Sequence, residues 1–205
     1  MFRSANPQIG RHAAEATARV LVTTVTDANA PAMPSTADLL RWRQQNPLAV
    51  WTHVDVPSGS AELRRAALIV AVAAARDPRH RHPSQLILLG ARAAGRLALE
   101  LVLEGVLACD GIVVTDIPCG PLRSPIVLRT AAVRLVAHKD GPVSEHGLID
   151  ALRAADIDER ILMLPPGSAR DAEATASATG TFLLELVATI SRQASNGVRS
   201  HDDQD

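Results

Sequence analysis

The chain has 205 residues, a formal net charge of -1 and 47% hydrophobic residues, which suits one soluble domain that buries its own core. With no basic field and only 2% aromatic residues, it lacks the usual features of nucleic-acid-binding proteins, and we expect no such partner. No continuous apolar run of about 18 residues is present, and the first residues lack a secretory apolar segment. We therefore expect no membrane span and a cytoplasmic location.

Short apolar runs typical of buried strands alternate along the chain with helical patterns. In chain order we expect strand 19–24, helix 37–45, strand 48–54, helix 61–76, strand 86–89, helix 93–104, strand 111–115, strand 133–137, helix 145–155, strand 160–164 and helix 181–192. This alternation predicts a mostly parallel sheet of about six strands with helices on both faces, which is a three-layer α/β sandwich. We expect a lead-in over 1–18, one domain over 19–193 and a disordered tail over 194–205.

The segment LILLGARAAG, residues 86–95, joins an apolar strand to a helix through a Gly-x-Arg-x-x-Gly turn. A sharp strand-to-helix turn of this kind is typical of a nucleophile elbow, which presents a serine or cysteine to substrate. The presenting position here holds Arg92. Arginine stays protonated in proteins and is no nucleophile, so the motif predicts an architecture without its usual chemistry.

Ligands of open parallel sheets bind beyond the carboxyl ends of the strands. Polar residues expected at those ends supply the candidates for a ligand site, and surface strand ends also carry such residues for solubility alone. The candidates for ligand binding are Arg92, Asp116, His53 and Asp55.

The order of the elements resembles the α/β-hydrolase family, in its small carboxylesterase- or dienelactone-hydrolase-like branch. The resemblance rests on the turn at 90–95, on AHKDGPV at 137–143 and on PPGSARDAEA at 165–174. It implies a nucleophile in the turn, an acid after a later strand and a histidine after the last strand. The acid could survive as Asp140, but the turn holds Arg92 and no histidine lies between Pro165 and Thr181. The triad is therefore degenerate, and loss of one member already removes most of such a unit's rate.

Three other kinds of chemistry compete with this interpretation. Gly90 and Gly95 followed by Asp116 echo a dinucleotide fingerprint, although Arg92 replaces its middle glycine. Cys119, in a proline-rich loop, could pair with His138 as a nucleophile, although an inert buried cysteine is the commoner case. A metal could bind His80 and His82, or the His53–Asp55 pair, but no further ligand stands at a diagnostic spacing. We expect neither a metal nor a cofactor.

Arg92 itself permits two interpretations. Its guanidinium could bind a carboxylate or phosphate ligand. Alternatively it forms an internal ion pair with Asp116 or Asp140, which would offset a cost of about 0.3–1 kcal/mol for a cation at a helix N-terminus. We favour the internal pair, because Asp55, Asp116 and Asp140 all follow expected strands.

We therefore predict a hydrolase-like domain without catalysis that serves as a binding or assembly module. Its partner would be a small anionic ligand, a protein or a second copy of the chain. The alternative is a divergent hydrolase of a small acyl or ester substrate with relocated groups. Its candidate catalytic residues are Cys119, His138, Asp116 and Asp140.

Overall fold

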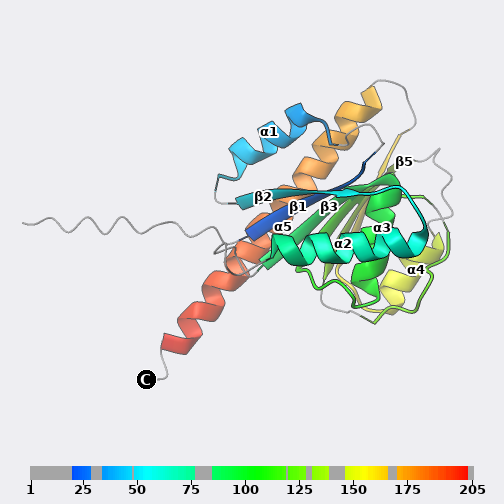
Figure 1. The fold of residues 1–205 in the computed structure, drawn as a ribbon. Coiled ribbons are helices and arrows are strands. Elements are labelled where there is room, and N and C mark those ends of the chain that lie inside the picture. Colours follow the sequence, from blue (N-terminus) through cyan, green and yellow to red (C-terminus); the bar gives the residue numbers. More distant parts are fainter. Residues whose placement is uncertain are drawn as a thin grey trace, which may run out of the picture.

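All six strands of the sheet run parallel, in the order β2-β1-β3-β4-β5-β6 (Figure 1). This computed structural model describes residues 20–28, 34–47, 49–76, 85–118, 120–127, 131–138, 146–165 and 170–202. The strands are β1 (Val20–Asp27), β2 (Ala49–Val56), β3 (Gln85–Ala91), β4 (Gly111–Thr115), β5 (Ala132–His138) and β6 (Glu159–Leu164). The predicted parallel sheet is confirmed.

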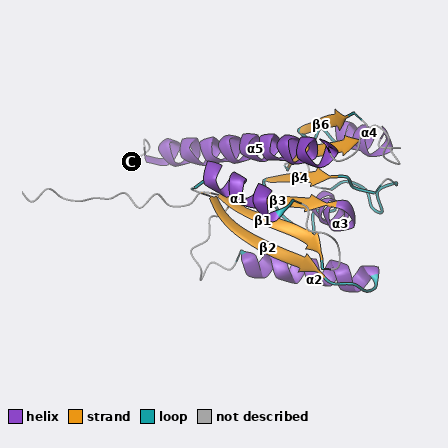
Figure 2. Ribbon diagram, turned by 90° about the horizontal axis from the view of Figure 1, so that it is seen from above, coloured by secondary structure: helices purple, strands orange, loops and turns teal. Residues whose placement is uncertain are grey.

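Five helices of the described residues cover the two faces of the sheet (Figure 2). They are α1 (Thr36–Gln45), α2 (Ala61–Ala75), α3 (Arg92–Leu103), α4 (His146–Ala154) and α5 (Arg170–Asp202). Buried residues of α2, α3 and α4 share one apolar cluster, whereas those of α1 and α5 share the other. The molecule is thus the three-layer sandwich that the sequence predicts.

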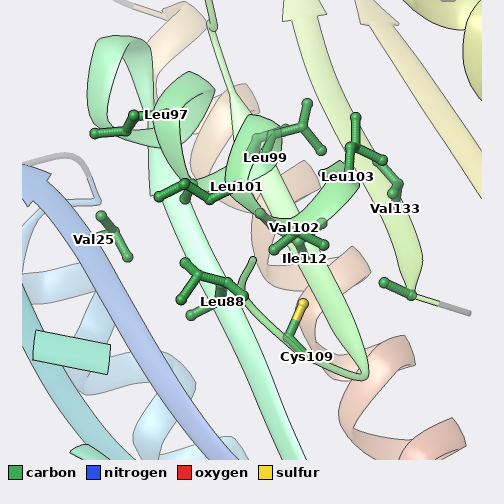
Figure 3. Packing of buried hydrophobic residues seen from close by; sticks show 14 of the residues in the cluster. Val25, Leu88, Leu97, Leu99, Leu101, Val102, Leu103, Cys109, Ile112 and Val133 are labelled. Atoms are coloured by element: carbon green, nitrogen blue, oxygen red, sulfur yellow. The ribbon is translucent and has the colours of Figure 1, made fainter. Parts of the chain in front are cut away.

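The pleat of the central strand β3 explains why both faces need a helix layer. Leu86 and Leu88 belong to the cluster under α3, and Ile87 and Leu89 belong to the cluster under α5. Because successive side chains of a strand point to opposite faces, a strand that is apolar throughout must be covered on both. Figure 3 shows Leu88 beside Leu101 and Val102 of α3 in the first cluster.

The last helix differs most from its prediction. The sequence predicts a helix over 181–192 with a disordered tail from 194, whereas α5 begins at Arg170, continues to Asp202 and projects beyond the sheet (Figures 1 and 2). Gly180 lies inside this helix, although glycine is a poor helix former. A Cβ at Gly180 would lie 2.4 Å from Nε1 of Trp42, so the glycine allows close packing of α1 on α5.

One stretch of α5, Ala172–Gln193, is the candidate membrane span found among the described residues, with mean hydropathy 1.2. Half of that stretch is buried within the domain. Leu183, Leu186 and Ile190 pack in the cluster over the sheet. The apolar character of α5 is therefore accounted for by core packing.

Candidate functional site

The chain turns sharply between β3 and α3. The strand ends at Ala91 in extended backbone, and Arg92 follows with φ of +52°, in the left-handed region that non-glycine residues rarely adopt. The next residues are already helical. This is the elbow that the sequence predicts, and the side chain it presents, that of Arg92, is exposed.

Two glycines make the turn possible by letting strand and helix touch. A Cβ on Gly90 would lie 2.6 Å from Cα of Gly95, and a Cβ on Gly95 would lie 2.7 Å from the carbonyl carbon of Gly90. Real Cβ atoms essentially never come this close to backbone. The glycine spacing that also suggests a dinucleotide fingerprint thus has a packing explanation in this fold.

The start of α3 is capped by a residue from the neighbouring strand. Asp27 ends β1, which lies beside β3, and its Oδ2 accepts a hydrogen bond of 3.1 Å from the backbone N–H of Ala94. Its Oδ1 accepts a hydrogen bond from Arg64 of α2. A carboxylate at this position compensates the partial positive charge of the helix N-terminus. Sequence reasoning assigned Asp27 no such role; the signal was an acid at the end of a strand adjacent to β3.

Arg92 does not form the internal ion pair with Asp116 that the sequence favours. Within the described part of the chain no ion pair involves Arg92, and the residue is exposed. Asp116 instead binds His138, and Asp27 supplies the negative charge that α3 needs. The other expected partner, Asp140, lies outside the described residues, as do Cys119, His80 and His82.

Asp116 and His138, two of the predicted candidates, are brought together at the ends of β4 and β5. Nδ1 of His138 lies 2.8 Å from Oδ1 of Asp116, and its Nε2 lies 3.1 Å from the hydroxyl oxygen of Thr175 in α5. In the neutral imidazole, Nδ1–H donates to the carboxylate and Nε2 accepts the proton of the hydroxyl. Asp116 has φ of +49°, so its backbone is also strained. The order carboxylate, imidazole, hydroxyl is that of a nucleophile-activating relay.

Thr175 also borders a cavity of about 280 Å³ between α1 and α5. Its inner wall includes Leu89, Gly90, Thr115 and Trp42. Thr175 as a residue is only 2% exposed, and it forms part of the wall of this cavity. Gly90, the first glycine of the elbow, also lines this cavity, so the cavity adjoins the elbow.

His53 and Asp55 are brought together at the edge of the sheet, with β1 between them and the elbow strand β3. Nε2 of His53 lies 3.0 Å from Oδ1 of Asp55, and Nδ1 lies 2.8 Å from the hydroxyl of Thr24. Thr26 donates a hydrogen bond of 2.6 Å to Asp55, which is the main reason that the pKa of this carboxyl is lowered. The four residues predicted to bind ligand therefore fall into separate places: an exposed elbow, a half-buried relay and a sheet edge.

Within the described ranges, no three histidine, cysteine, aspartate or glutamate side chains gather as metal ligands would. Cys109, which reads as a core residue in the sequence, is buried in the cluster under α3 (Figure 3). Burial raises the pKa of its thiol to about 12. Such a thiol is a poor source of nucleophilic thiolate.

Neither a family model nor a curated protein matches the sequence. Solved structures do match the fold. The esterase PE8 superposes with a TM-score of 0.63 at 16% identity, covering 83% of this chain and 94% of that chain. Esterase B from Lactobacillus rhamnosis gives 0.61 at 11% identity, covering 90% of this chain and 81% of that chain. A protein assigned to the α/β hydrolase superfamily from Xanthomonas campestris pv. campestris gives 0.55 at 12% identity, covering 82% and 99%. At such identities the likeness shows a hydrolase-like α/β fold.

Proposed function

We propose that this chain is a catalytically degenerate α/β-hydrolase-like domain that acts as a binding or assembly module. The observation that carries the proposal is the exposed Arg92 at the apex of the elbow, with φ of +52°. The fold provides the strained turn that would present a nucleophile, and the side chain that it presents is a permanent cation. An arginine at this position can bind an anion or a protein surface, but it cannot attack a carbonyl.

Asp27 supports the same conclusion. Acyl transfer requires hydrogen-bond donors directed at a developing oxyanion, and helix N-termini commonly supply them. Here the carboxylate of Asp27 accepts from Ala94 in the first turn of α3. This N–H is therefore already occupied by an internal acceptor and does not point to a substrate oxygen. The attacking group of ester hydrolysis is therefore replaced, and one N–H donor of the first turn of α3 is taken by Asp27.

Turnover of short-chain p-nitrophenyl esters by the purified protein tests this proposal. We expect the wild type to match the buffer rate and to show no burst of p-nitrophenol. Arg92→Ser should also be inactive, because no histidine lies between Pro165 and Thr181 to serve as its base. Turnover that survives repeated purification and disappears in His138→Ala would overturn the proposal, whereas activity of Arg92→Ser would show that another base serves the elbow.

The second candidate function is a divergent hydrolase with relocated groups, favoured by the relay from Asp116 through His138 to Thr175. In this case the hydroxyl of Thr175 would attack a small ester or acyl group in the adjoining cavity of about 280 Å³. His138 would take its proton and pass it to the alcohol that leaves when the ester bond breaks, and Asp116 would stabilise the imidazolium in between. Water, activated by His138 in the same way, would then hydrolyse the acyl-threonine and release the acid. Loss of turnover in Thr175→Val together with retention in Thr175→Ser would identify this hydroxyl; loss in Cys119→Ala alone would assign the attack to that thiol.

We keep a cytoplasmic location and a small anionic ligand as parts of the proposal, the latter because of the exposed Arg92. The alternative to a small anionic ligand is a larger partner, either another protein or a second copy of this chain. Analytical ultracentrifugation across a range of protein concentrations distinguishes the second copy, since self-association alone makes the sedimentation coefficient depend on concentration.

A further inference from the structure

A second cavity, of about 300 Å³, lies on the opposite face of the sheet from the cavity beside Thr175. It opens between the first turns of α2 and α3 and the loop that follows β4. The charged side chains of its wall are three arginines, Arg64, Arg96 and Arg123, and one glutamate, Glu100. No catalytic candidate named above contributes to this wall among the described residues.

Two of the three arginines are held by neighbours. Arg64 donates a hydrogen bond to Asp27. Nε of Arg96 donates to Glu100 at 2.9 Å, and its Nη2 donates to the carbonyl oxygens of Gly120 and Pro121 at 3.0 and 2.9 Å. These bonds fix the loop after β4 against α3 and so build the wall. The carboxylate of Asp27 is thereby paired with Arg64, and the carboxylate of Glu100 is paired with Arg96.

Arg123 is the least constrained of the three arginines. Its Nε lies 3.6 Å from Oε2 of Glu100, which is longer than a hydrogen bond, and its side chain is 60% exposed. Glu62 and Glu104 also interact with Arg123 electrostatically, without a recorded hydrogen bond to it. Arg123 can therefore turn its guanidinium to a ligand without breaking a direct hydrogen bond to any described residue.

Two helix N-termini also border the cavity, through Ala61 of α2 and Ala93 of α3. Each carries partial positive charge, but each already has an acid beside it. Asp27 accepts from Ala94 in the first turn of α3, and Glu62 lies in the first turn of α2. The arginine side chains, and not the helix ends, therefore define the site.

We propose that this cavity binds the phosphate or carboxylate group of a small molecule, with Arg123 as its mobile contact and Arg96 as its fixed wall. The inference rests on the proposed function, which it deepens by naming a ligand class and a location. Guanidinium groups bind oxyanions through paired, directional N–H bonds. The hydrogen bonds of Arg96 to described residues use Nε and Nη2, and Nη1 has none of them. A volume of about 300 Å³ admits a compact molecule only.

Isothermal titration calorimetry of the full chain tests the site with inorganic phosphate and with malonate as probes, at ionic strength held constant by sodium chloride. Arg123→Ala should weaken the affinity of the bound probe about tenfold, the effect of losing about 1.4 kcal/mol of charge-assisted contact. The matched control is Arg153→Ala, because Arg153 is a similarly exposed arginine whose ion pair with Glu159 lies elsewhere. This control should bind like the wild type.

Tighter binding of phosphate indicates a phosphate ligand, and tighter binding of malonate indicates a carboxylate ligand. Either result supports the site if Arg123→Ala lowers the affinity for the preferred probe. Equal binding by wild type and Arg123→Ala, or no heat beyond that of chloride, overturns it. The ester assay is read separately. If the protein hydrolyses the esters and still binds the anion, the proposed function is wrong and the anion site stands. If it neither hydrolyses the esters nor binds the anion, the anion site is wrong and the proposed function stands.

Discussion

The carboxylate of Asp27 binds the backbone N–H of Ala94, across the gap between β1 and the first turn of the elbow helix. The contact joins two residues that lie 67 positions apart in the sequence. It exists because β1 and β3 are neighbours in a parallel sheet, so that the end of one strand meets the helix that follows the other. The capping charge of α3 is thus supplied by topology, since the N-cap position itself holds Ala91, which makes no capping bond.

Replacement of Asp27 should therefore destabilise the whole fold and not merely a surface loop. For Asp27→Ala we expect a loss of about 2 kcal/mol in the free energy of unfolding, from a lost cap of about 1 kcal/mol and from the unpaired Arg64. Asp27→Asn, which keeps an acceptor, should lose about half as much. Urea unfolding followed by circular dichroism measures both.

Asp38 is the control for Asp27, because its contacts are local to the start of α1: it pairs with Arg41 one turn away and accepts a hydrogen bond from Ser35. Asp38→Ala should cost less than about 1 kcal/mol. If Asp27→Ala cost no more than Asp38→Ala, the carboxylate would not stabilise the start of α3.

The close contact of Gly90 with Gly95 predicts a different sensitivity. Gly95→Ala puts a methyl group 2.7 Å from the backbone of Gly90, which cannot move without displacing β3 from the sheet centre. We expect a loss of about 3 kcal/mol or failure to fold. Gly147→Ala in α4 is the matched helical control, since nothing lies within 4 Å of its added Cβ. That variant should gain up to about 1 kcal/mol. Similar melting temperatures for the two variants would refute the packing argument.

The sequence predicts the layers of this fold well, because its strands are short apolar runs separated by helical patterns or loops. The elbow at Arg92 is predictable for the same reason, since apolar strand, paired glycines and helix follow directly along the chain. The contacts of the site are not predictable in this way. Asp27 reaches Ala94, and His138 reaches Thr175, only through strand order and the early start of α5. The sequence places polar residues at strand ends, but it does not state which carboxylate faces which cation.

The thiol of Cys109 should make stability fall at alkaline pH. Its pKa is raised to about 12 in the fold, chiefly by burial, from 9.0. Above pH 9.0 the unfolded chain ionises this thiol while the folded chain keeps it protonated, so the thiol's contribution to stability is lost as pH rises toward 12. The free energy of unfolding should fall by up to about 1.4 kcal/mol per pH unit in this range.

Cys109→Ala provides the comparison, because its unfolding free energy should depend less steeply on pH in that window, whatever its absolute value. The same burial predicts that Cys109 reacts with Ellman's reagent only after unfolding, measured in a Cys119→Ser background. Rapid labelling of the native protein, or identical pH slopes for the two variants, would contradict the burial of this thiol.

Arg134 and Arg160 both bind Glu185 of α5 at 3.0 Å, yet they should contribute very differently to stability. The side chain of Arg134 is 3% exposed and also donates to the carbonyl oxygens of Val133 and Asp158, whereas that of Arg160 is 60% exposed. Arg134→Ala should cost about 3 kcal/mol, because it leaves a cavity and unpaired buried acceptors between β5 and α5. Arg160→Ala should cost less than about 1 kcal/mol, since exposed ion pairs contribute little.

The loss for Arg134→Met should fall between those of the two alanine variants. Methionine fills most of the volume and removes the buried Nε, which has no partner in the described surroundings. Equal losses for Arg134→Ala and Arg160→Ala in urea unfolding would mean that the shared ion pair, and not burial, sets the contribution of each arginine.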